Sequence, residues 1–226
     1  MHNGDTSIKK PRDHWEQACD FFETMLDDFR SKNLLRKNID KSERERLNLV
    51  WENSRKYEIA LNNLFNRFSS VGMDAGAARV DFDKKCAAVG SPKDTVNYLI
   101  FSQLIGTFLL KLEALFRTSL LFFLEEREGI RRHDTLRELL KKIKKISPPI
   151  GKELNNLINT DLRNHLAHGT FWFQGNTLFH AENSYLEEST KMPLGKLMFE
   201  NLKMNLITNA LVHTLKQKEE HGYFES

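Results

Sequence analysis

The sequence has few of the residues that would staple a chain or break its helices. Its two cysteines, Cys19 and Cys86, form no Cys-x-x-Cys or Cys/His spacing, so neither a disulfide framework nor a zinc site is expected. Reduced thiols fit a cytoplasmic protein. Only five prolines and 11 glycines occur in 226 residues, which leaves room for long uninterrupted helices.

Long hydrophobic runs are also missing. The most apolar run, Tyr98 to Leu110, contains Gln103 and is followed by Lys111. It is shorter than the ~20 residues that span a bilayer, so it predicts a buried helix and no membrane partner. The first residues, Met-His-Asn-Gly-Asp, lack the basic and apolar regions of a secretory signal peptide.

Charge of one sign does not dominate, because 34 basic and 31 acidic residues leave a net charge of +3. The densest basic stretch runs from Arg127 to Lys145 and holds eight Arg or Lys. One interpretation is a solvated helix face. The other is a track for RNA phosphates with a steep salt dependence. In the second interpretation the candidate RNA-binding residues are Arg131, Arg132, Lys141, Lys142, Lys144 and Lys145.

Apolar residues recur at helical spacing along most of the chain, which predicts an all-α protein with long helices. The expected helices cover about 13–32, 40–68, 93–127, 135–146, 151–168 and 193–220. We expect residues 1–12 and the tail after Gly222 to be disordered or frayed. A further short helix over about 77–88 is possible in the irregular stretch from Val71 to Pro92.

The helix expected over 93–127 is apolar on most sides, which is typical of a helix buried in a bundle. Lys111, Glu113 and Arg117 interrupt it, and we expect them to be exposed or locally ion-paired. A placement of Glu113 or Arg117 in a functional cleft is the alternative. We predict two parts that together form one compact unit: residues 1–90 as a helical arm with its connection, and residues 91–226 as the bundle.

One small β element is expected among these helices. Phe171-Trp172-Phe173 and Thr177 to His180 read as two strands joined by Gln174-Gly175-Asn176. The aromatic side chains either pack on the bundle or stack on an RNA base. We interpret His180, like His213, as structural.

The chain is organised around a short stretch that precedes this hairpin, Asp161 to Gly169, with the pattern Arg-Asn-x-x-x-His. It lies at the end of an expected helix, and Gly169 is a natural residue to end it. Asn164 and His168 are four residues apart and share one helix face, so the amide can orient the imidazole. Arg163 lies at the edge of that face. A second Arg/His pair, Arg127 and His133, straddles Glu128-Gly129, which should leave its side chains unfixed.

This motif resembles the signature of the HEPN superfamily, all-α domains that often cut RNA. The likeness is specific over about Leu154 to Phe179 and only architectural elsewhere. It implies a HEPN-like helical bundle, a homodimer and a metal-independent endoribonuclease without a cofactor. Its catalytic residues would be Arg163, Asn164 and His168. It also implies a toxin or anti-phage (abortive infection) role, with an antitoxin protein or RNA as a further partner.

The residue types suit that chemistry. Histidine can act as general acid or base near neutral pH, and arginine supplies a fixed cation where negative charge develops on a phosphate. Three other interpretations remain open: a surface ion-pair region at a helix end, an RNA- or partner-binding module that does not cut, and a scaffold that pairs through residues 40–68. The sequence thus predicts a site at 163–168 without proving an activity.

Overall fold

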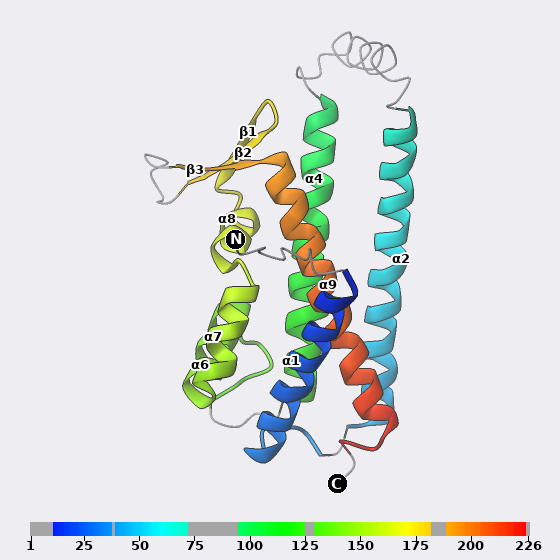
Figure 1. Cartoon of the computed structure of the whole chain (residues 1–226), viewed down its shortest axis with the longest axis vertical. Coiled ribbons are helices and arrows are strands. Elements are labelled where there is room, and N and C mark those ends of the chain that lie inside the picture. The colour runs from blue at the N-terminus through cyan, green and yellow to red at the C-terminus, as the bar shows by residue number, and fades with distance from the viewer. Residues whose placement is uncertain (1–10, 38, 72–94, 125–128, 182–188, 225–226) are drawn as a thin grey trace, which may run out of the picture. The chain divides into compact units, whose positions relative to one another are not determined.

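Helices make up most of the structure, with one small β-sheet, as the apolar periodicity predicts (Figure 1). The structure is a computed structural model that describes residues 11–37, 39–71, 95–124, 129–181 and 189–224. The chain divides into two compact units. Unit 1 comprises residues 1–40, 116–157 and 205–226, and unit 2 comprises residues 41–115 and 158–204. The possible helix over 77–88 and the predicted boundary at residue 90 lie outside the described residues.

Unit 2 is built on two long helices that lie side by side, α2 (Lys41–Val71) and α4 (Thr95–Leu110) (Figure 1). The expected helix over 93–127 is observed as α4, a π-helical segment η1 (Lys111–Arg117) and a short α5 (Thr118–Phe123). Lys111 is only 5% exposed, and its ammonium nitrogen lies 3.2 Å from a carboxylate oxygen of Glu58 on α2. Burial lowers the pKa of Lys111, although the Glu58 carboxylate opposes that shift.

The prediction of one continuous helix over 151–168 is wrong. The structure has two helices there, α7 (Pro148–Leu157) in unit 1 and α8 (Thr160–His168) in unit 2. Asn159 accounts for the break, because its side-chain oxygen accepts the N–H of Leu162 at 3.0 Å and so caps α8. The motif therefore lies on its own short helix.

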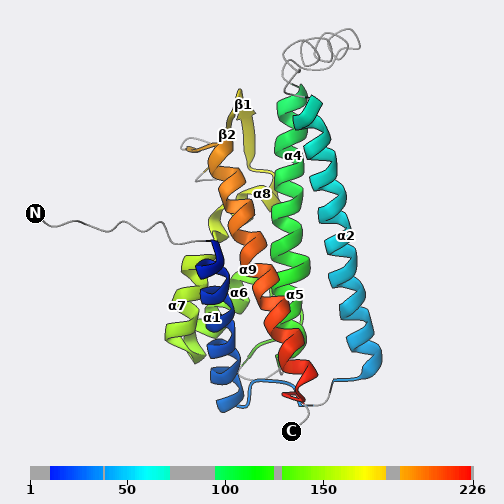
Figure 2. The same ribbon diagram turned by 45° about the vertical axis from the view of Figure 1, so that its right-hand side comes forward.

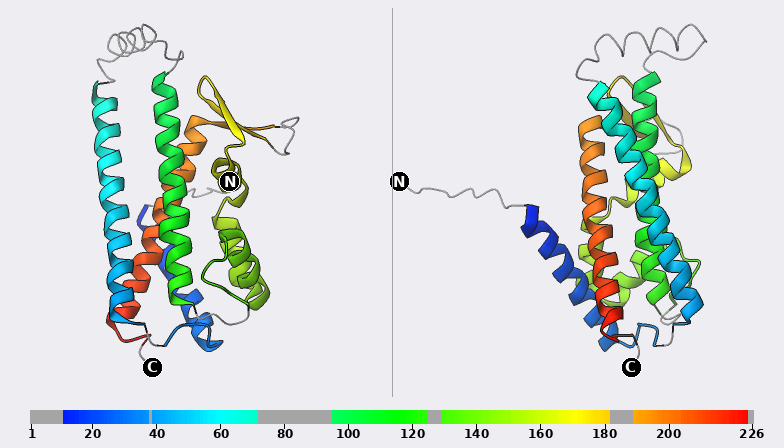
Figure 3. Two further views of the ribbon diagram at one scale, coloured as in Figure 1. Left: turned by 180° about the vertical axis from the view of Figure 1, so that it is seen from behind. Right: turned by 90° about the vertical axis from the view of Figure 1, so that its right-hand side faces the viewer.

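Three strands follow α8 in unit 2: β1 (Phe171–Gln174), β2 (Thr177–Ala181) and β3 (Ser189–Pro193) (Figure 3). They form an antiparallel sheet in the order β1-β2-β3, so the predicted hairpin is present. The third strand was not expected, because its sequence, Ser-Thr-Lys-Met-Pro, buries only Met192. The final helix, α9 (Leu194–Glu220), begins directly after it and contributes to both units.

Unit 1 packs α1 (Pro11–Ser31), α5, α6 (Leu136–Ile146), α7 and the C-terminal part of α9. Helix α1 begins at Pro11, inside the segment expected to be disordered, because proline suits the first position of a helix. Helix α1 lies beside the C-terminal part of α9 (Figure 2). The tail after Gly222 was also expected to fray, and this is wrong for two of its residues. The Tyr223 hydroxyl donates to Asp27 at 2.7 Å, and Phe224 is 2% exposed and packs on Phe123.

Candidate functional site

The motif helix α8 has a buried side and an exposed side. Leu162 and Leu166 are 1% and 4% exposed and fix the helix on the core of unit 2, where it contacts α4 and β2. Gly169 ends the helix with φ of 70°, a left-handed conformation that favours glycine, as expected. These contacts leave Arg163, Asn164 and His168 on or near the surface.

Arg163 is held by a carboxylate from a distant part of the chain. Its Nε donates to Glu113 Oε1 at 2.7 Å, and its Nη2 forms an ion pair with the same oxygen. Its Nη1 donates to Asn164 Oδ1 at 3.0 Å. The Arg163 side chain is 16% exposed, so the guanidinium is largely fixed in place. Glu113 was expected to be exposed or locally ion-paired. It is ion-paired, but with a motif residue 50 positions along the chain and not within its own helix.

This arrangement leaves part of the guanidinium available. An arginine side chain has five N–H donors. The contacts with Glu113 and Asn164 use three of them, one each on Nε, Nη1 and Nη2. One N–H on Nη1 and one on Nη2 remain within the described residues, and such a pair matches two oxygens of a phosphate. The site can therefore present a positioned, bidentate donor pair.

His168 differs from Arg163 in having no hydrogen bond or ion pair within the described ranges. It is exposed in the last turn of α8. Asn164 was expected to orient Arg163, His168 or both, and its amide oxygen accepts from Arg163. The imidazole is thus accessible to a ligand, whereas the guanidinium is pre-positioned.

Two further histidines join α8 to the sheet. The His165 ring lies 4.7 Å from the His180 ring of β2, centroid to centroid, and its Nδ1 lies 3.0 Å from Thr170 Oγ1. His180 is 6% exposed, which agrees with its interpretation as a structural residue. The Thr170 N–H also donates to the His165 carbonyl at 3.1 Å. The strand that follows the motif is therefore fixed to the motif helix.

The described part of the predicted basic stretch, residues 129–145, lies in unit 1, on α6 and in the turn before it. Lys142 is engaged within the fold, because its Nζ lies 2.6 Å from both carboxylate oxygens of Asp134. The Arg131 N–H donates to the same carboxylate at 2.8 Å. Burial would raise the pKa of Asp134, but these hydrogen bonds outweigh it and hold the pKa below its ordinary value. The other candidate RNA-binding residues have exposed side chains: Arg131, Arg132, Lys141, Lys144 and Lys145.

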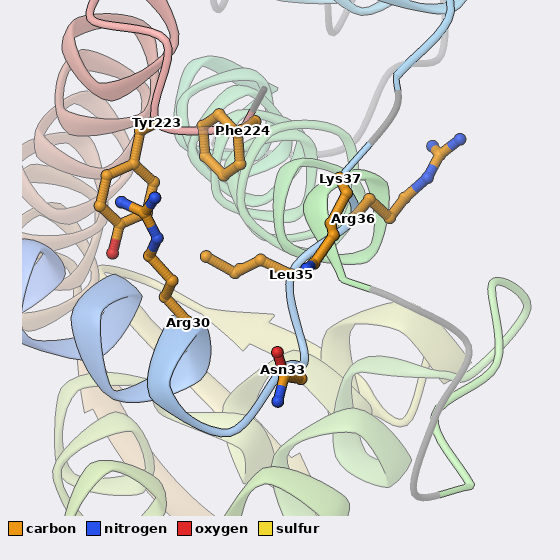
Figure 4. A pocket seen from close by; sticks show the side chains of 7 residues that line it. All are labelled: Arg30, Asn33, Leu35, Arg36, Lys37, Tyr223 and Phe224. Atoms are coloured by element: carbon orange, nitrogen blue, oxygen red, sulfur yellow. The ribbon is translucent and has the colours of Figure 1, made fainter. Parts of the chain in front are cut away.

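A small cavity in unit 1 was not expected from the sequence. It has a volume of about 160 Å³ and lies where the C-terminal segment meets the end of α1 (Figure 4). The Arg30 guanidinium lies 4.3 Å from the centre of the Tyr223 ring, and Arg36 donates to the carbonyl of Phe122 at 3.2 Å. These cations hold the chain segments around the cavity together, so we interpret it as a consequence of that packing. Its lining residues are Arg30, Asn33, Leu35, Arg36, Lys37, Tyr223 and Phe224.

No group of three or more His, Cys, Asp or Glu side chains in the described part of the chain has the proximity to hold a metal ion. None of the described helices combines the length and apolar character that crossing a bilayer requires. Comparisons with protein families, with curated proteins and with solved structures found no match. The interpretation of the site therefore rests on the chemistry of its own residues.

Proposed function

We propose that this chain is a metal-independent endoribonuclease that uses Arg163 and His168, like the HEPN nucleases that its motif resembles. The observation that carries the proposal is the fixed guanidinium. Glu113 and Asn164 hold it so that one N–H on each terminal nitrogen remains for a ligand. A bidentate donor pair of this kind suits a phosphodiester, and an exposed histidine lies five residues further along the same helix.

The proposed reaction uses a base, an acid and a cation from side chains, together with the 2′-hydroxyl of the RNA itself. A base removes the proton of a ribose 2′-OH, the 2′-oxygen attacks the neighbouring phosphorus, and the bond from phosphorus to the 5′-oxygen breaks. An acid returns a proton to that 5′-oxygen. The products are a 2′,3′-cyclic phosphate and a 5′-hydroxyl. Arg163 would stabilise the extra negative charge on the phosphorus oxygens, and His168 would transfer a proton.

A second copy of the chain completes this scheme. One imidazole can accept the first proton and donate one to the leaving oxygen only in successive steps, whereas two His168 residues in one cleft can act as base and acid together and so react faster. The Arg163–Glu113 pair is also formally neutral, so a second guanidinium would add to the stabilisation. We therefore propose a homodimer with a shared cleft. A toxin or anti-phage role, with an antitoxin protein or RNA as partner, follows from the same resemblance.

The test is cleavage of total cellular RNA by purified protein in excess EDTA, with the ends of the products mapped. The wild-type chain should give cyclic-phosphate ends, and His168→Ala should give none while its circular dichroism and melting temperature are unchanged. His133→Ala is the matched control, because His133 is also exposed but lies outside the motif. Equal cleavage by wild type and His168→Ala would refute the assignment of the catalyst.

A non-catalytic RNA- or partner-binding module is the second candidate. The favouring observation is that Glu113 neutralises Arg163, as in a purely structural clamp between η1 and α8. In that case His168→Ala would keep full function, and neutralising the exposed lysines of α6 would weaken RNA binding. Salt-sensitive binding without cleavage by any variant would favour this candidate.

A further inference from the structure

The three-stranded sheet of unit 2 has one buried face and one exposed face. Phe173 faces inward and stacks on Phe101 of α4 with ring centres 4.3 Å apart, and Leu178 and Met192 are 0% and 2% exposed. The neighbouring positions therefore point outward, because side chains alternate along a strand. This separates the aromatic run after the motif into two sets, since Phe173 belongs to the core and Trp172 is 37% exposed.

The outward residues form a row across the three strands. Trp172 of β1 pairs directly with Phe179 of β2, which pairs with Lys191 of β3. The Trp172 and Phe179 rings are stacked, with centres 5.5 Å apart and planes 8° from parallel. The Lys191 Nζ lies 5.9 Å from the centre of the Phe179 ring. The row is thus an ordered stack of a cation and two parallel rings.

The stack is open at one end. Within the part of the chain that the structure describes, β1 is an edge strand, so Phe179 covers the side of Trp172 toward β2 and no strand pairs with β1 on the other side. The Trp172 side chain is 37% exposed, so part of its ring is accessible to a ligand. A flat aromatic group could extend the stack from Trp172 without any change in the sheet.

We propose that Trp172, Phe179 and Lys191 form a platform on which an unpaired base of a single-stranded RNA stacks. Proteins that bind single strands use aromatic side chains as stacking surfaces, with basic groups for the phosphates. The only charged side chain in β1, β2 and β3 is Lys191, which suits an anionic strand. This inference rests on the proposed function, since it names a subsite for the same substrate.

The platform is close enough to the motif to serve it. Trp172 lies four positions after His168, and a fully extended chain of that length spans at most about 14 Å. The contacts of Thr170 and His180 with His165 keep the sheet fixed to α8. His180, which contacts α8, lies on the buried face of the sheet, opposite to Trp172. An RNA strand that stacks on Trp172 would therefore pass around the edge of the sheet at β1 and reach α8 a few nucleotides away. The platform would position unpaired nucleotides for cleavage and would discriminate against duplex RNA, whose bases are already stacked.

The experiment measures binding of a labelled oligouridine of about eight nucleotides, the size of one single-strand site, by fluorescence anisotropy. All chains carry His168→Ala so that the probe stays intact. Trp172→Ala should weaken binding about 5- to 100-fold, the loss expected for one stacked base. Trp172→Phe, which keeps a ring, should recover most of the affinity. Phe199→Ala is the matched control, because Phe199 is an aromatic residue 63% exposed on α9 of the same unit, and its loss should leave affinity unchanged.

The outcomes separate this inference from the proposed nuclease activity. Unchanged binding by Trp172→Ala overturns the platform, and cleavage of RNA by the wild-type chain would then still support the nuclease. Trp172-dependent binding without cleavage by the wild-type chain supports the platform and removes the nuclease. An equal loss for Phe199→Ala and Trp172→Ala overturns the platform as well, because it would indicate a general effect of exposed apolar surface.

Discussion

At the scale of single residues, Glu113 decides how Arg163 can be used. A long arginine side chain on a helix surface samples many rotamers, and immobilising it costs conformational entropy. In unit 2 the hydrogen bonds to Glu113 and Asn164 offset this loss of entropy when the chain folds. In the proposed reaction the guanidinium would then need little rearrangement to bind a phosphate, which is the condition for effective electrostatic stabilisation of a transition state.

Glu113 should therefore act as a positioning residue. We expect Glu113→Ala to lower kcat for RNA cleavage by about 10- to 100-fold with a smaller effect on KM, because Arg163 loses its fixed orientation. Glu113→Gln keeps an acceptor oxygen and should recover much of that rate. The free energy of unfolding should fall by about 1–2 kcal/mol in the alanine variant, since the pair is partly buried. An alanine variant that loses stability but keeps its full kcat would show that Glu113 is only structural.

Asp134 also fixes neighbouring groups, in unit 1. Its carboxylate accepts hydrogen bonds from Lys142 and from the Arg131 N–H, and its side chain is 5% exposed. Its pKa in the folded chain is lower than its ordinary value of 3.8. The unfolded chain therefore binds a proton first as the pH falls, so the stabilisation is present above 3.8 and is lost below it.

We accordingly expect the free energy of unfolding to fall as the pH drops below about 4, and Asp134→Asn to remove part of that slope. Near neutral pH the variant should be less stable by about 1–3 kcal/mol, because it weakens hydrogen bonds to a buried carboxylate. Urea titrations at several pH values measure both effects. Lys142→Gln should also destabilise the chain, whereas Lys141→Gln, an exposed neighbour on α6, should not. Equal stability of the two lysine variants would contradict this role of Asp134.

At the scale of elements, α6 and α7 approach each other so closely that only glycine fits between them. A Cβ at Gly151 would lie 2.3 Å from the Lys144 Cα and 2.6 Å from its Cβ. Both atoms are fixed to the backbone of α6, so relief requires that the two helices move apart. Gly151 thus sets the distance between α7 and the helix that carries the basic stretch.

We expect Gly151→Ala to destabilise the chain by about 1–3 kcal/mol, the usual cost of overpacking, although alanine is the better helix former. The same change at Gly106 in α4 is the control, because a Cβ there meets nothing within 4 Å. Gly106→Ala should be neutral or stabilising by up to about 1 kcal/mol. Thermal melts of the two variants provide the comparison. A stabilised Gly151→Ala chain would refute the close approach.

The sequence predicts those elements whose periodicity is undisturbed. Helices α2, α6 and α9 and the β1–β2 hairpin match the expected ranges closely because each buries one regular side. The break at Asn159 is hidden, since Leu154, Ile158, Leu162 and Leu166 keep the i, i+4 spacing across it. The sequence does not indicate strand β3 either, because this strand has little apolar pattern and forms by pairing with β2.

The candidate site likewise contains some residues that the sequence indicates and others that it does not. Arg163, Asn164 and His168 are local, so a motif can indicate them. The partner Glu113 lies 50 residues away in sequence, and a contact at that separation cannot be read from spacing. Its only signal was a carboxylate in an otherwise apolar helix. The role of Trp172 likewise depended on the strand register, which decides whether it or Phe173 points outward.

At the scale of the whole molecule, the proposed mechanism requires two chains. Each copy supplies one Arg163 and one His168, and a shared cleft would hold two of each. Because the two copies are related by symmetry, a defect in one copy can be compensated by the intact residue of the other. A cleft within a single chain has no such property, so the difference can be measured.

We expect Arg163→Ala and His168→Ala to be inactive separately and to recover cleavage when they are mixed and allowed to exchange subunits. Heterodimers would be the commonest species after exchange, and each would keep one guanidinium and one imidazole in the shared cleft. The recovered rate should remain below that of wild type, because one acid–base group and one cation are missing. A mixture of Arg163→Ala with the double variant Arg163→Ala/His168→Ala is the control and should stay inactive, since no guanidinium is supplied. If differently tagged subunits exchange but the first mixture stays inactive, the cleft is not shared, and both proton transfers must then be assigned within one chain.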